Sequence, residues 1–390
     1  MTDSRSSGST SDVSGPAGGF DTAEDGHLDH RVLTALRRVI DPEIRKPIVD
    51  LDMIGGVTVA GDTASVALKL TIVGCPAADT IERDVREAAA SVPGISHVDV
   101  DVSIMTRAER DALTDKLRGG RAKTVQFGPD SLTRIYAVTS GKGGVGKSTL
   151  TANLGVALAA QGLRVGIVDA DVFGFSIPGI LGIAGAKPTQ VNDMILPPLA
   201  HDVKVISIGM FVDGNKAVSW RGPMLHRTIQ QFLTDVHFGD LDVLLLDLPP
   251  GTGDVAISLG QLLPHAEVIV VTTPQAAAAE VAERSALVAR QTGQSVLGVV
   301  ENMAGLPQAD GTILRLFGEG GGAAAAANLG TSVLASVPLS MALREGGDAG
   351  LPVVLSHPED PAAAAILTLA GTLATRARGL AGRPLGLSLS

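Results

Sequence analysis

Residues 140–149, SGKGGVGKST, constrain the fold more than any other stretch of this 390-residue chain. They fit the pattern G-x-x-x-x-G-K-[ST], in which glycines let backbone N–H groups turn toward a phosphate. The apolar run IYAVT precedes them and the helical stretch LTANLGVALAAQG follows. That order is the context this motif requires, because the helix N-terminus adds positive potential at the phosphate. The sequence therefore predicts a phosphate-binding loop between a strand and a helix.

The predicted nucleotide site consists of this loop and one acid from a later strand. Lys147 is expected to reach the β- and γ-phosphate oxygens, and the Ser148 hydroxyl is expected to bind Mg²⁺. Asp247 follows the run DVLLL, where a carboxylate holds Mg²⁺ or its water shell. The loop residues predicted to bind nucleotide are Gly141, Lys142, Gly143, Gly144, Val145, Gly146, Lys147, Ser148 and Thr149.

The same letters also contain G-x-G-x-x-G, the pattern of a dinucleotide-binding turn. Asp169 and Asp171 follow at about the spacing of a ribose-binding acid. Such a turn has no need of Lys147 and Ser148, whereas Asp247 at the end of a later strand fits a phosphate loop. These two features favour a nucleoside triphosphate over a dinucleotide.

Short apolar runs alternate with helical segments from Arg134 to about residue 375. The runs are IYAVT, RVGIV, DVLLL, EVIVVT and VLGVV. Strands that are apolar throughout and separated by helices indicate a mostly parallel sheet covered by helices on both faces. The predicted fold class is therefore α/β, with a P-loop domain at residues 134–375.

Residues 27–105 predict a small α+β domain in front of the P-loop domain. LDHRVLTALRRVI has helical periodicity, and Asp41-Pro42 is expected to end that helix. GGVTVAG and DTASVALKLTI are strand-like, and HVDVDVSI alternates as a third strand. Pro76 is expected to open a helix that runs to about Ser91.

Three further segments have weak folding patterns. Residues 1–26 are rich in Ser, Gly, Asp and Thr, and they predict a disordered tail because they bury too little apolar surface to offset chain entropy. Residues 106–133 are charged and polar, and they predict a partly helical linker. Residues 376–390 contain Gly and Pro, and they predict a second tail that makes a poor amphipathic helix.

The composition narrows the classes of partner and compartment. The formal net charge is −10 and no long Lys/Arg block occurs, which argues against nucleic acid and against anionic membrane surfaces as partners. The single cysteine cannot form an intrachain disulfide. We find no secretory-signal pattern and no apolar stretch approaching the ~20 residues that span a bilayer. We therefore expect a cytoplasmic protein without stable membrane association.

A family resemblance rests on the loop and on motifs that follow it in order. SGKGGVGKST, with its extra lysine at Lys142, resembles the deviant Walker A ATPases, the group containing MinD, ParA and the nitrogenase iron protein. DADVFGFSIPGILG, VSWRGPML, LLLDLPPGTGDVAISLGQLLP, VVTTPQ and GVVENM resemble the Mrp/ApbC family of iron–sulfur cluster carriers. DPE, LTIVGCP and VDVDV resemble the small iron–sulfur assembly-type domain that is often fused in front of that family.

The resemblance implies an activity and an assembly. The protein would bind and hydrolyse ATP with Mg²⁺, and would deliver iron–sulfur clusters to client apoproteins or work with a scaffold. Two copies would enclose two nucleotides as a homodimer, in which Lys142 reaches the partner's phosphates. A second cation there stabilises the charge that develops on the transferring phosphoryl group.

The resemblance also implies roles for single residues. Lys142, Lys147 and Asp171 would be catalytic, with Asp171 orienting the attacking water. Ser148, Asp171 and Asp247 would hold Mg²⁺, Asp169 would support the loop, and Asn302 would hydrogen-bond adenine. The bland alternatives are strand-end solvation for Asp169 and Asp171, and a turn cap for Asn302. Trp220 to Pro223 are either dimer surface or ordinary loop packing.

One family feature is missing from the chain. Many relatives carry C-x-x-C between the ENM motif and the next FG, and two such pairs supply the four thiolates of a [4Fe–4S] cluster. This chain reads ENMAGLPQADGTILRLFGEGGG, without cysteine. Gln308 and Asp310 are hard oxygen ligands and replace thiolate poorly. The sequence therefore predicts either a transient cluster with borrowed ligands or no cluster at all.

Cys75, the only cysteine, is the candidate cluster ligand. If Pro76 is the first residue of a helix, Cys75 lies at its N-cap, where the positive end of the helix favours a thiolate. The alternative is that Cys75 is a small buried hydrophobic residue. Three functions stay open: an ATP-hydrolysing cluster carrier, a positioning switch of the MinD/ParA kind, and a nucleotide-gated adaptor that never holds iron.

Overall fold

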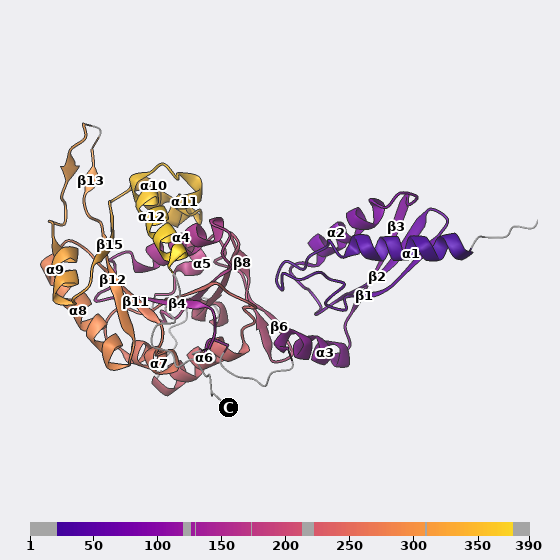
Figure 1. Cartoon of the computed structure of the whole chain (residues 1–390), viewed down its shortest axis with the longest axis horizontal. Coiled ribbons are helices and arrows are strands. Elements are labelled where there is room, and N and C mark those ends of the chain that lie inside the picture. The colour runs from indigo at the N-terminus through magenta and orange to yellow at the C-terminus, as the bar shows by residue number, and fades with distance from the viewer. Residues whose placement is uncertain are drawn as a thin grey trace, which may run out of the picture. The chain divides into compact units, whose positions relative to one another are not determined.

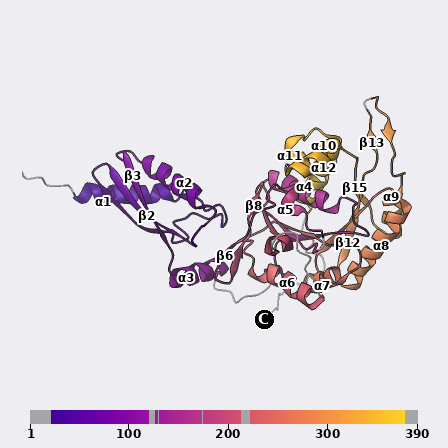
Figure 2. The ribbon, with the colours of Figure 1, turned by 180° about the vertical axis from the view of Figure 1, so that it is seen from behind.

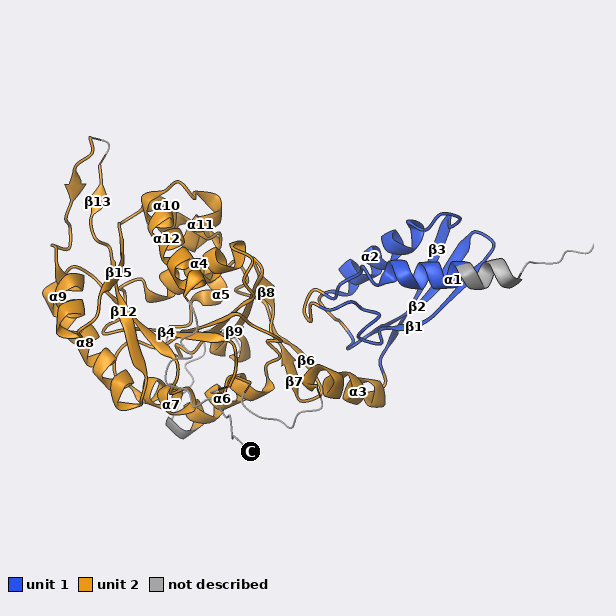
Figure 3. Ribbon diagram, viewed as in Figure 1, with its two compact units in different colours: residues 1–41, 46–73, 77–105 blue, residues 42–45, 74–76, 106–390 orange. Residues whose placement is uncertain are grey.

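The structure is a computed structural model that describes residues 22–119, 126–128, 130–172, 174–212, 222–308 and 310–376. The chain divides into two compact units (Figure 3). The first comprises residues 1–41, 46–73 and 77–105, and the second comprises residues 42–45, 74–76 and 106–390. The predicted tails lie outside the described residues up to residue 21 and from residue 377 onward.

The first unit is a three-stranded sheet with two helices. β1 (Ile54–Ala60) pairs antiparallel with β2 (Thr63–Leu70), and β2 pairs in parallel with β3 (His97–Ile104). α1 (Thr22–Leu36) and α2 (Ala78–Ala90) pack against each other and against the strands. This is the small α+β arrangement that the sequence predicts.

Two helix boundaries differ from the sequence-based expectation. α1 begins at Thr22, inside the segment expected to be tail, and ends at Leu36 instead of at Asp41-Pro42. The linker, which was predicted to be partly helical, contains one helix, α3 (Arg107–Arg118). Its first turn is closed by a capping box between Thr106 and Glu109, and such reciprocal side-chain bonds stabilise a helix that is polar on most sides.

The second unit is built on an eight-stranded sheet with the order β15-β12-β11-β4-β10-β5-β9-β8. Every neighbouring pair is parallel except β8 and β9. All five apolar runs that predicted strands form strands, whereas β8, β9 and β15 were not predicted. The strands are β4 (Arg134–Ser140), β5 (Val165–Asp169), β8 (Leu199–Ala200), β9 (Val203–Ser207), β10 (Val243–Asp247), β11 (Glu267–Thr272), β12 (Ser295–Asn302) and β15 (Val333–Val337).

Helices cover both faces of this sheet (Figures 1 and 2). One face packs against α4 (Lys147–Ala160), α5 (Ile177–Ile180), α11 (Val353–Ser356) and α12 (Pro361–Thr375). The other packs against α6 (Gly222–Asp235), α7 (Asp254–Leu262), α8 (Ala276–Gln291) and α9 (Gly321–Asn328). Successive strand residues face opposite helix layers, which is why the strands are apolar throughout. The predicted fold class is confirmed.

Smaller elements complete the second unit. α10 (Met341–Ala349) packs on α5 and α11, and a short 3₁₀ helix, η1, follows β9 at Ile208–Phe211. Two short ribbons join β6 (Thr189–Val191) to β7 (Met194–Leu196) and β13 (Leu306–Pro307) to β14 (Ile313–Leu314). No helix among the described residues is long and apolar enough to cross a membrane.

The carboxyl ends of the parallel strands meet at one edge of the sheet. β4 ends at Ser140, β5 at Asp169, β10 at Asp247 and β12 at Asn302. Ligands of open α/β sheets bind outside this edge. The polar residues singled out in the sequence are therefore brought together by the direction of the strands.

Candidate nucleotide-binding site

The phosphate loop links β4 to α4, as the motif predicts. Gly146 is the N-cap of α4 with φ 82°, and Gly144 has φ 80°, a backbone region that favours glycine. Gly141 has a different reason to be glycine, since a Cβ there would lie 2.3 Å from the backbone of Val281 and Ala282 in α8. The loop is thus shaped by its own turns and by the helix packed behind it.

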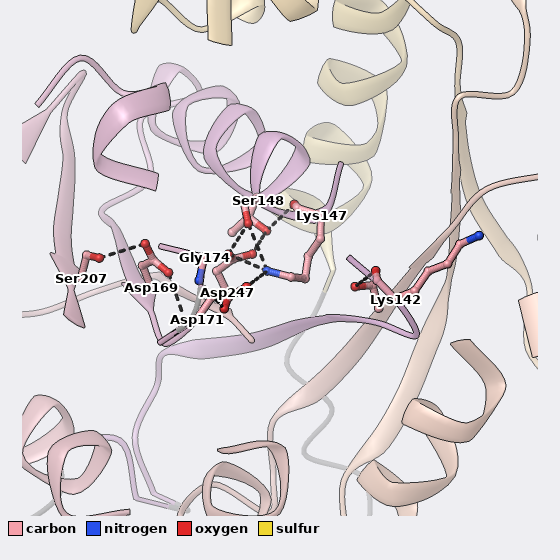
Figure 4. Close-up of polar contacts among 10 residues, drawn as sticks. Lys142, Lys147, Ser148, Asp169, Asp171, Gly174, Ser207 and Asp247 are labelled. Carbon is pink, nitrogen blue, oxygen red and sulfur yellow. Dashed lines mark hydrogen bonds and ion pairs between the residues drawn. The ribbon is translucent and has the colours of Figure 1, made fainter. Parts of the chain in front are cut away.

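Asp247 is the hub of the site (Figure 4). Its Oδ2 accepts hydrogen bonds from Lys147 Nζ at 2.7 Å and from Ser148 Oγ at 2.6 Å. Its Oδ1 accepts from Thr151 Oγ1 at 2.9 Å. Asp247 is 0% exposed, so these partners compensate a fully buried carboxylate. Thr151 was missed in the sequence, although it lies one helical turn after Lys147 and therefore on the same face of α4.

Two further carboxylates lie next to this hub. Asp171 Oδ2 is 3.8 Å from Lys147 Nζ, and Asp171 Oδ1 accepts a bond from the Gly174 amide. Asp169 accepts hydrogen bonds from Ser207 Oγ and from the Asp171 amide. Burial, followed by the charge of Asp247, raises the pKa of Asp169 to about 7.

Two carboxylates therefore lie within 4 Å of the Lys147 ammonium group, and a third, Asp169, lies next to them. Protonation of Asp169 or the arrival of a cation relieves the excess negative charge. The oxygen donors offered by Ser148, Asp171 and Asp247 are of the hard type that Mg²⁺ prefers, and Mg²⁺ is typically completed by phosphate and water. The residues present fit this metal.

Lys142 lies in the loop but points away from Lys147 (Figure 4). Its Nζ donates to Gln275 Oε1 at 3.2 Å, and Gln275 is the N-cap residue of α8. The structure therefore does not bring Lys142 together with Lys147 and Asp171, the other two residues predicted to be catalytic.

Asn302 makes its described contact with the phosphate loop itself. Its side-chain amide donates to the Val145 carbonyl at 2.8 Å and is buried. A Cβ on Gly146 would lie 2.2 Å from that amide nitrogen, so Asn302 also explains the glycine at this position. The residue thus supports the loop through the end of β12.

A cavity of about 590 Å³ lies beside the loop. This volume is within the range of small-molecule sites. Its lining includes Lys142 to Thr149 from the loop, Asp171, Leu225, Pro249, Pro250 and Asp254. The segment around Pro249 and Asp254 connects β10 to α7, so the wall of the cavity includes the chain that follows Asp247.

The prediction that Cys75 is a helix N-cap is wrong. α2 begins at Ala78 and its N-cap is Ala77, so Pro76 is not its first residue. The chain turns at Gly74, with φ 72°, and Cys75 is only 7% exposed. The burial matches the alternative of a small hydrophobic residue. No group of three or more His, Cys, Asp and Glu side chains in the described part of the chain is arranged to hold a metal ion.

The segment that lacks C-x-x-C forms the β13–β14 ribbon. Ile313, Leu314 and Leu316 are each at least half exposed there. Asp310 accepts hydrogen bonds from the Thr312 hydroxyl and amide, which lower the pKa of Asp310. Asp310 therefore serves the turn of the ribbon. Trp220 and Arg221, the other surface candidates, lie outside the described residues.

The loop, the strand-end acid and the covered parallel sheet together define a P-loop NTPase. A family model described as NUBPL iron-transfer P-loop NTPase, of the ParA group, matches residues 131–374. A model described as iron-sulfur cluster assembly protein matches residues 29–102.

Curated relatives and one solved structure agree with these matches. The iron-sulfur cluster carrier protein of Mycobacterium tuberculosis H37Rv is 54% identical over 372 residues, which cover 93% of this chain and 97% of that protein. Its counterpart from Synechocystis is 42% identical and covers 88% and 96%. An ADP-bound nucleotide-binding protein from Archaeoglobus fulgidus is 36% identical, with TM-score 0.51, and covers 59% and 92%. The chain belongs to the NUBPL-type family of ParA-related P-loop NTPases, which confirms the resemblance seen in its motifs.

Proposed function

We propose that this protein is an ATPase that carries iron–sulfur clusters to client apoproteins. The proposal that the protein binds and hydrolyses ATP rests on the site beside the cavity, where Lys147, Ser148 and Thr151 all donate hydrogen bonds to Asp247. The proposal that it carries iron–sulfur clusters is supported by relatives named iron-sulfur cluster carrier proteins, which match the chain over both units.

Binding of ATP changes the partner of Lys147. The ammonium group now held by Asp247 turns to the β- and γ-phosphate oxygens, which carry more charge than one carboxylate. Ser148, Asp171 and Asp247, the last released from that bond, would hold Mg²⁺. The metal neutralises phosphate charge when it is bound. Asp171 orients the attacking water, and Asp169 braces the Asp171 backbone.

A homodimer supplies the second cation. Lys142 is turned away from the phosphate site of its own copy, and its hydrogen bond joins a half-buried lysine to the exposed Gln275 at 3.2 Å, a contact that separates at little cost. Such a lysine can reach the nucleotide of a second copy. Asn302, whose amide now donates to the Val145 carbonyl, would hydrogen-bond the adenine, a role that the family resemblance implies.

The cluster is held transiently and with ligands from outside the chain. A dimer contributes only two cysteines, one Cys75 from each copy, whereas cluster iron usually needs four thiolates. A small thiol or the client's cysteines complete the set, and the buried Cys75 has to become accessible for this step. The cytoplasm is the proposed compartment.

A nucleotide-gated adaptor without iron is the second candidate. The missing C-x-x-C pair and the burial of Cys75 favour it. Both candidates hydrolyse ATP, so only cluster binding separates them.

Anaerobic reconstitution tests the proposal. ATP hydrolysis, iron and sulfide are measured for wild type and Cys75→Ser, with and without glutathione. The carrier function predicts a labile cluster on wild type only when glutathione is present, and none on Cys75→Ser. If neither protein takes up iron while both hydrolyse ATP, the adaptor is the correct function. A wild type that does not hydrolyse ATP contradicts both.

A further inference from the structure

Helix α8 lies behind the phosphate loop and touches it at several points. Its N-cap, Gln275, bonds Lys142, and its backbone at Val281 and Ala282 packs against Gly141. One turn further along, Ser285 reaches the root of the loop. No motif singled out Ser285 in the sequence.

The Ser285 hydroxyl lies between two backbone carbonyls. Its Oγ is 3.2 Å from Ser140 O and 3.2 Å from Gly251 O. A serine hydroxyl carries one hydrogen, so it can donate fully to only one of these acceptors at a time. The side chain is buried, with 4% exposed, so water does not readily take over the other bond.

The two carbonyls belong to two segments that line the cavity. Ser140 is the residue before the loop, and Gly251 lies between Pro250 and Asp254, which line the cavity. The Gly251 amide also donates to Ser140 O at 2.8 Å, which ties the segment to the loop in this structure. Gly251 has φ 90°, a conformation that suits a pivot in the 249–254 segment because glycine adopts it without strain.

We propose that Ser285 is a positioning residue that couples the 249–254 segment to the phosphate loop by moving its one hydroxyl hydrogen between Gly251 O and Ser140 O. With the hydrogen on Gly251 O, the segment is held in its resting position. When phosphate draws the 249–254 segment toward the cavity, the Ser285 hydroxyl rotates and donates to Ser140 O. Its hydrogen bond to Gly251 O is then lost. Both carbonyl oxygens lie within hydrogen-bonding distance of the same hydroxyl, so rotation of that hydroxyl can move its hydrogen bond from one to the other.

This inference rests on the proposed hydrolysis of ATP, yet its first test does not require turnover. Hydrogen exchange of the peptide containing residues 249–254 is compared in the presence of ADP and of ATPγS, both with Mg²⁺. Wild type should show a clear difference between the two nucleotides. Ser285→Ala should reduce that difference to less than about half, because the segment no longer shares a donor with the loop.

The second test separates binding from turnover. Ser285→Ala should lower kcat by about tenfold while the Kd for ATPγS stays within about twofold, as expected for a residue that positions the segment without touching nucleotide. Ser285→Cys keeps nearly the same volume with a weaker donor, so it should show a smaller loss of the same kind. If Ser285→Ala does not fold, Ser285→Cys tests the coupling in its place.

Thr133→Val is the matched control. Thr133 is also a buried hydroxyl that donates to a backbone carbonyl, Leu241 O at 2.9 Å, but it lies at the opposite end of β4. Thr133→Val should leave kcat unchanged, together with the difference in hydrogen exchange between the ADP-bound and ATPγS-bound protein. The inference is overturned if Ser285→Ala keeps the nucleotide-dependent difference with kcat within about twofold of wild type, or if Thr133→Val causes the same loss. If wild type hydrolyses no ATP, the proposed function fails while the exchange experiment still decides the coupling.

Discussion

The phosphate loop and the Cys75 turn are the two places where the sequence offers reactive chemistry, and their surroundings differ. Around the loop, Lys147 and Ser148 at the start of α4 each lie less than 3 Å from Asp247 at the end of β10. Cys75 is a single buried side chain ahead of α2, in a chain with no other cysteine. A site assembled from several strand ends carries its own partners, whereas a lone thiol depends on what approaches it.

The contrast extends to charge. The loop site concentrates three carboxylates and a lysine in a buried space, where each interaction is strong because water is excluded. Removing one charge there should have large effects on binding, catalysis or stability. Removing the thiol of Cys75 should leave nucleotide binding and hydrolysis nearly unchanged. The following substitutions test this difference, beginning with the largest expected effect.

Lys147→Ala should abolish nucleotide binding, with Kd for ATPγS raised by at least ~100-fold, because it removes the phosphate ligand and leaves Asp247 buried without its ammonium partner. Isothermal titration measures the binding, and thermal unfolding should show a lower Tm. The exposed Lys46→Ala is the control and should change neither quantity. Wild-type affinity in Lys147→Ala would place the nucleotide elsewhere.

Lys142→Ala should lower kcat by about 100-fold and leave the affinity for ATPγS nearly unchanged, since a trans-acting cation stabilises the transferring phosphoryl group more than the bound substrate. The side chain bonds Gln275 and points away from Lys147, so its loss should not disturb the loop. Steady-state hydrolysis and titration give the two numbers. A parallel loss of affinity would show that Lys142 binds the nucleotide of its own copy.

Asp169→Asn should flatten the pH dependence of stability in the nucleotide-free protein. The pKa of Asp169 is raised from 3.8 to about 7, so between these values the folded state keeps a proton that the unfolded state has lost. Stability from this group is therefore complete below pH 3.8 and is lost as pH rises through 7. Urea unfolding at pH 5 and pH 8 should show a smaller difference for Asp169→Asn than for wild type.

Asp242→Asn is the control for that experiment. Hydrogen bonding to Arg164 lowers the pKa of Asp242, so this carboxylate is ionised in both states between pH 5 and pH 8. Its substitution should leave the difference between the two pH values as it is in wild type. An unchanged difference in Asp169→Asn would mean that other groups set the pH dependence.

Cys75→Ser should have the smallest effect on the nucleotide reaction. kcat and the Kd for ATPγS should stay within about twofold of wild type, because Cys75 is not part of the cavity. Stability should fall by about 1–3 kcal/mol, since a hydroxyl replaces a thiol in a buried place. A large loss of hydrolysis in a variant that still folds would remove the contrast between the two regions.

The site shows which residues a sequence can indicate. The phosphate-loop motif identifies Lys147 and Ser148, and the position at the end of a strand identifies Asp247. The structure brings all three together. Thr151 and Ser207 were missed because a hydroxyl carries no distinctive pattern until its partner carboxylate is placed beside it. Cys75 was wrongly predicted to be an N-cap because the sequence does not distinguish a proline at the first position of a helix from one that lies two residues before it, as Pro76 does.

The sheet shows the same division. Long runs such as EVIVVT predicted strands because both of their faces are covered, which makes every residue apolar. β15 was not recognised, because its residues at the edge of the sheet are only partly buried and its sequence is correspondingly less apolar.

The sequence by itself determined the phosphate loop, the covered parallel sheet and the lack of a cysteine pair, since each of these is a local pattern that depends on neighbouring residues alone. Only the tertiary structure decided that Asp247 accepts three hydrogen bonds and that Ser285 lies between two carbonyls. It also decided that residue 141 must be glycine, because the backbone of α8 leaves no room for a Cβ there. Apart from Ser285 with Gly251, which are 34 positions apart, these contacts join residues about 100 or more positions apart. The direction of the strands and the packing of helices on the sheet bring them together.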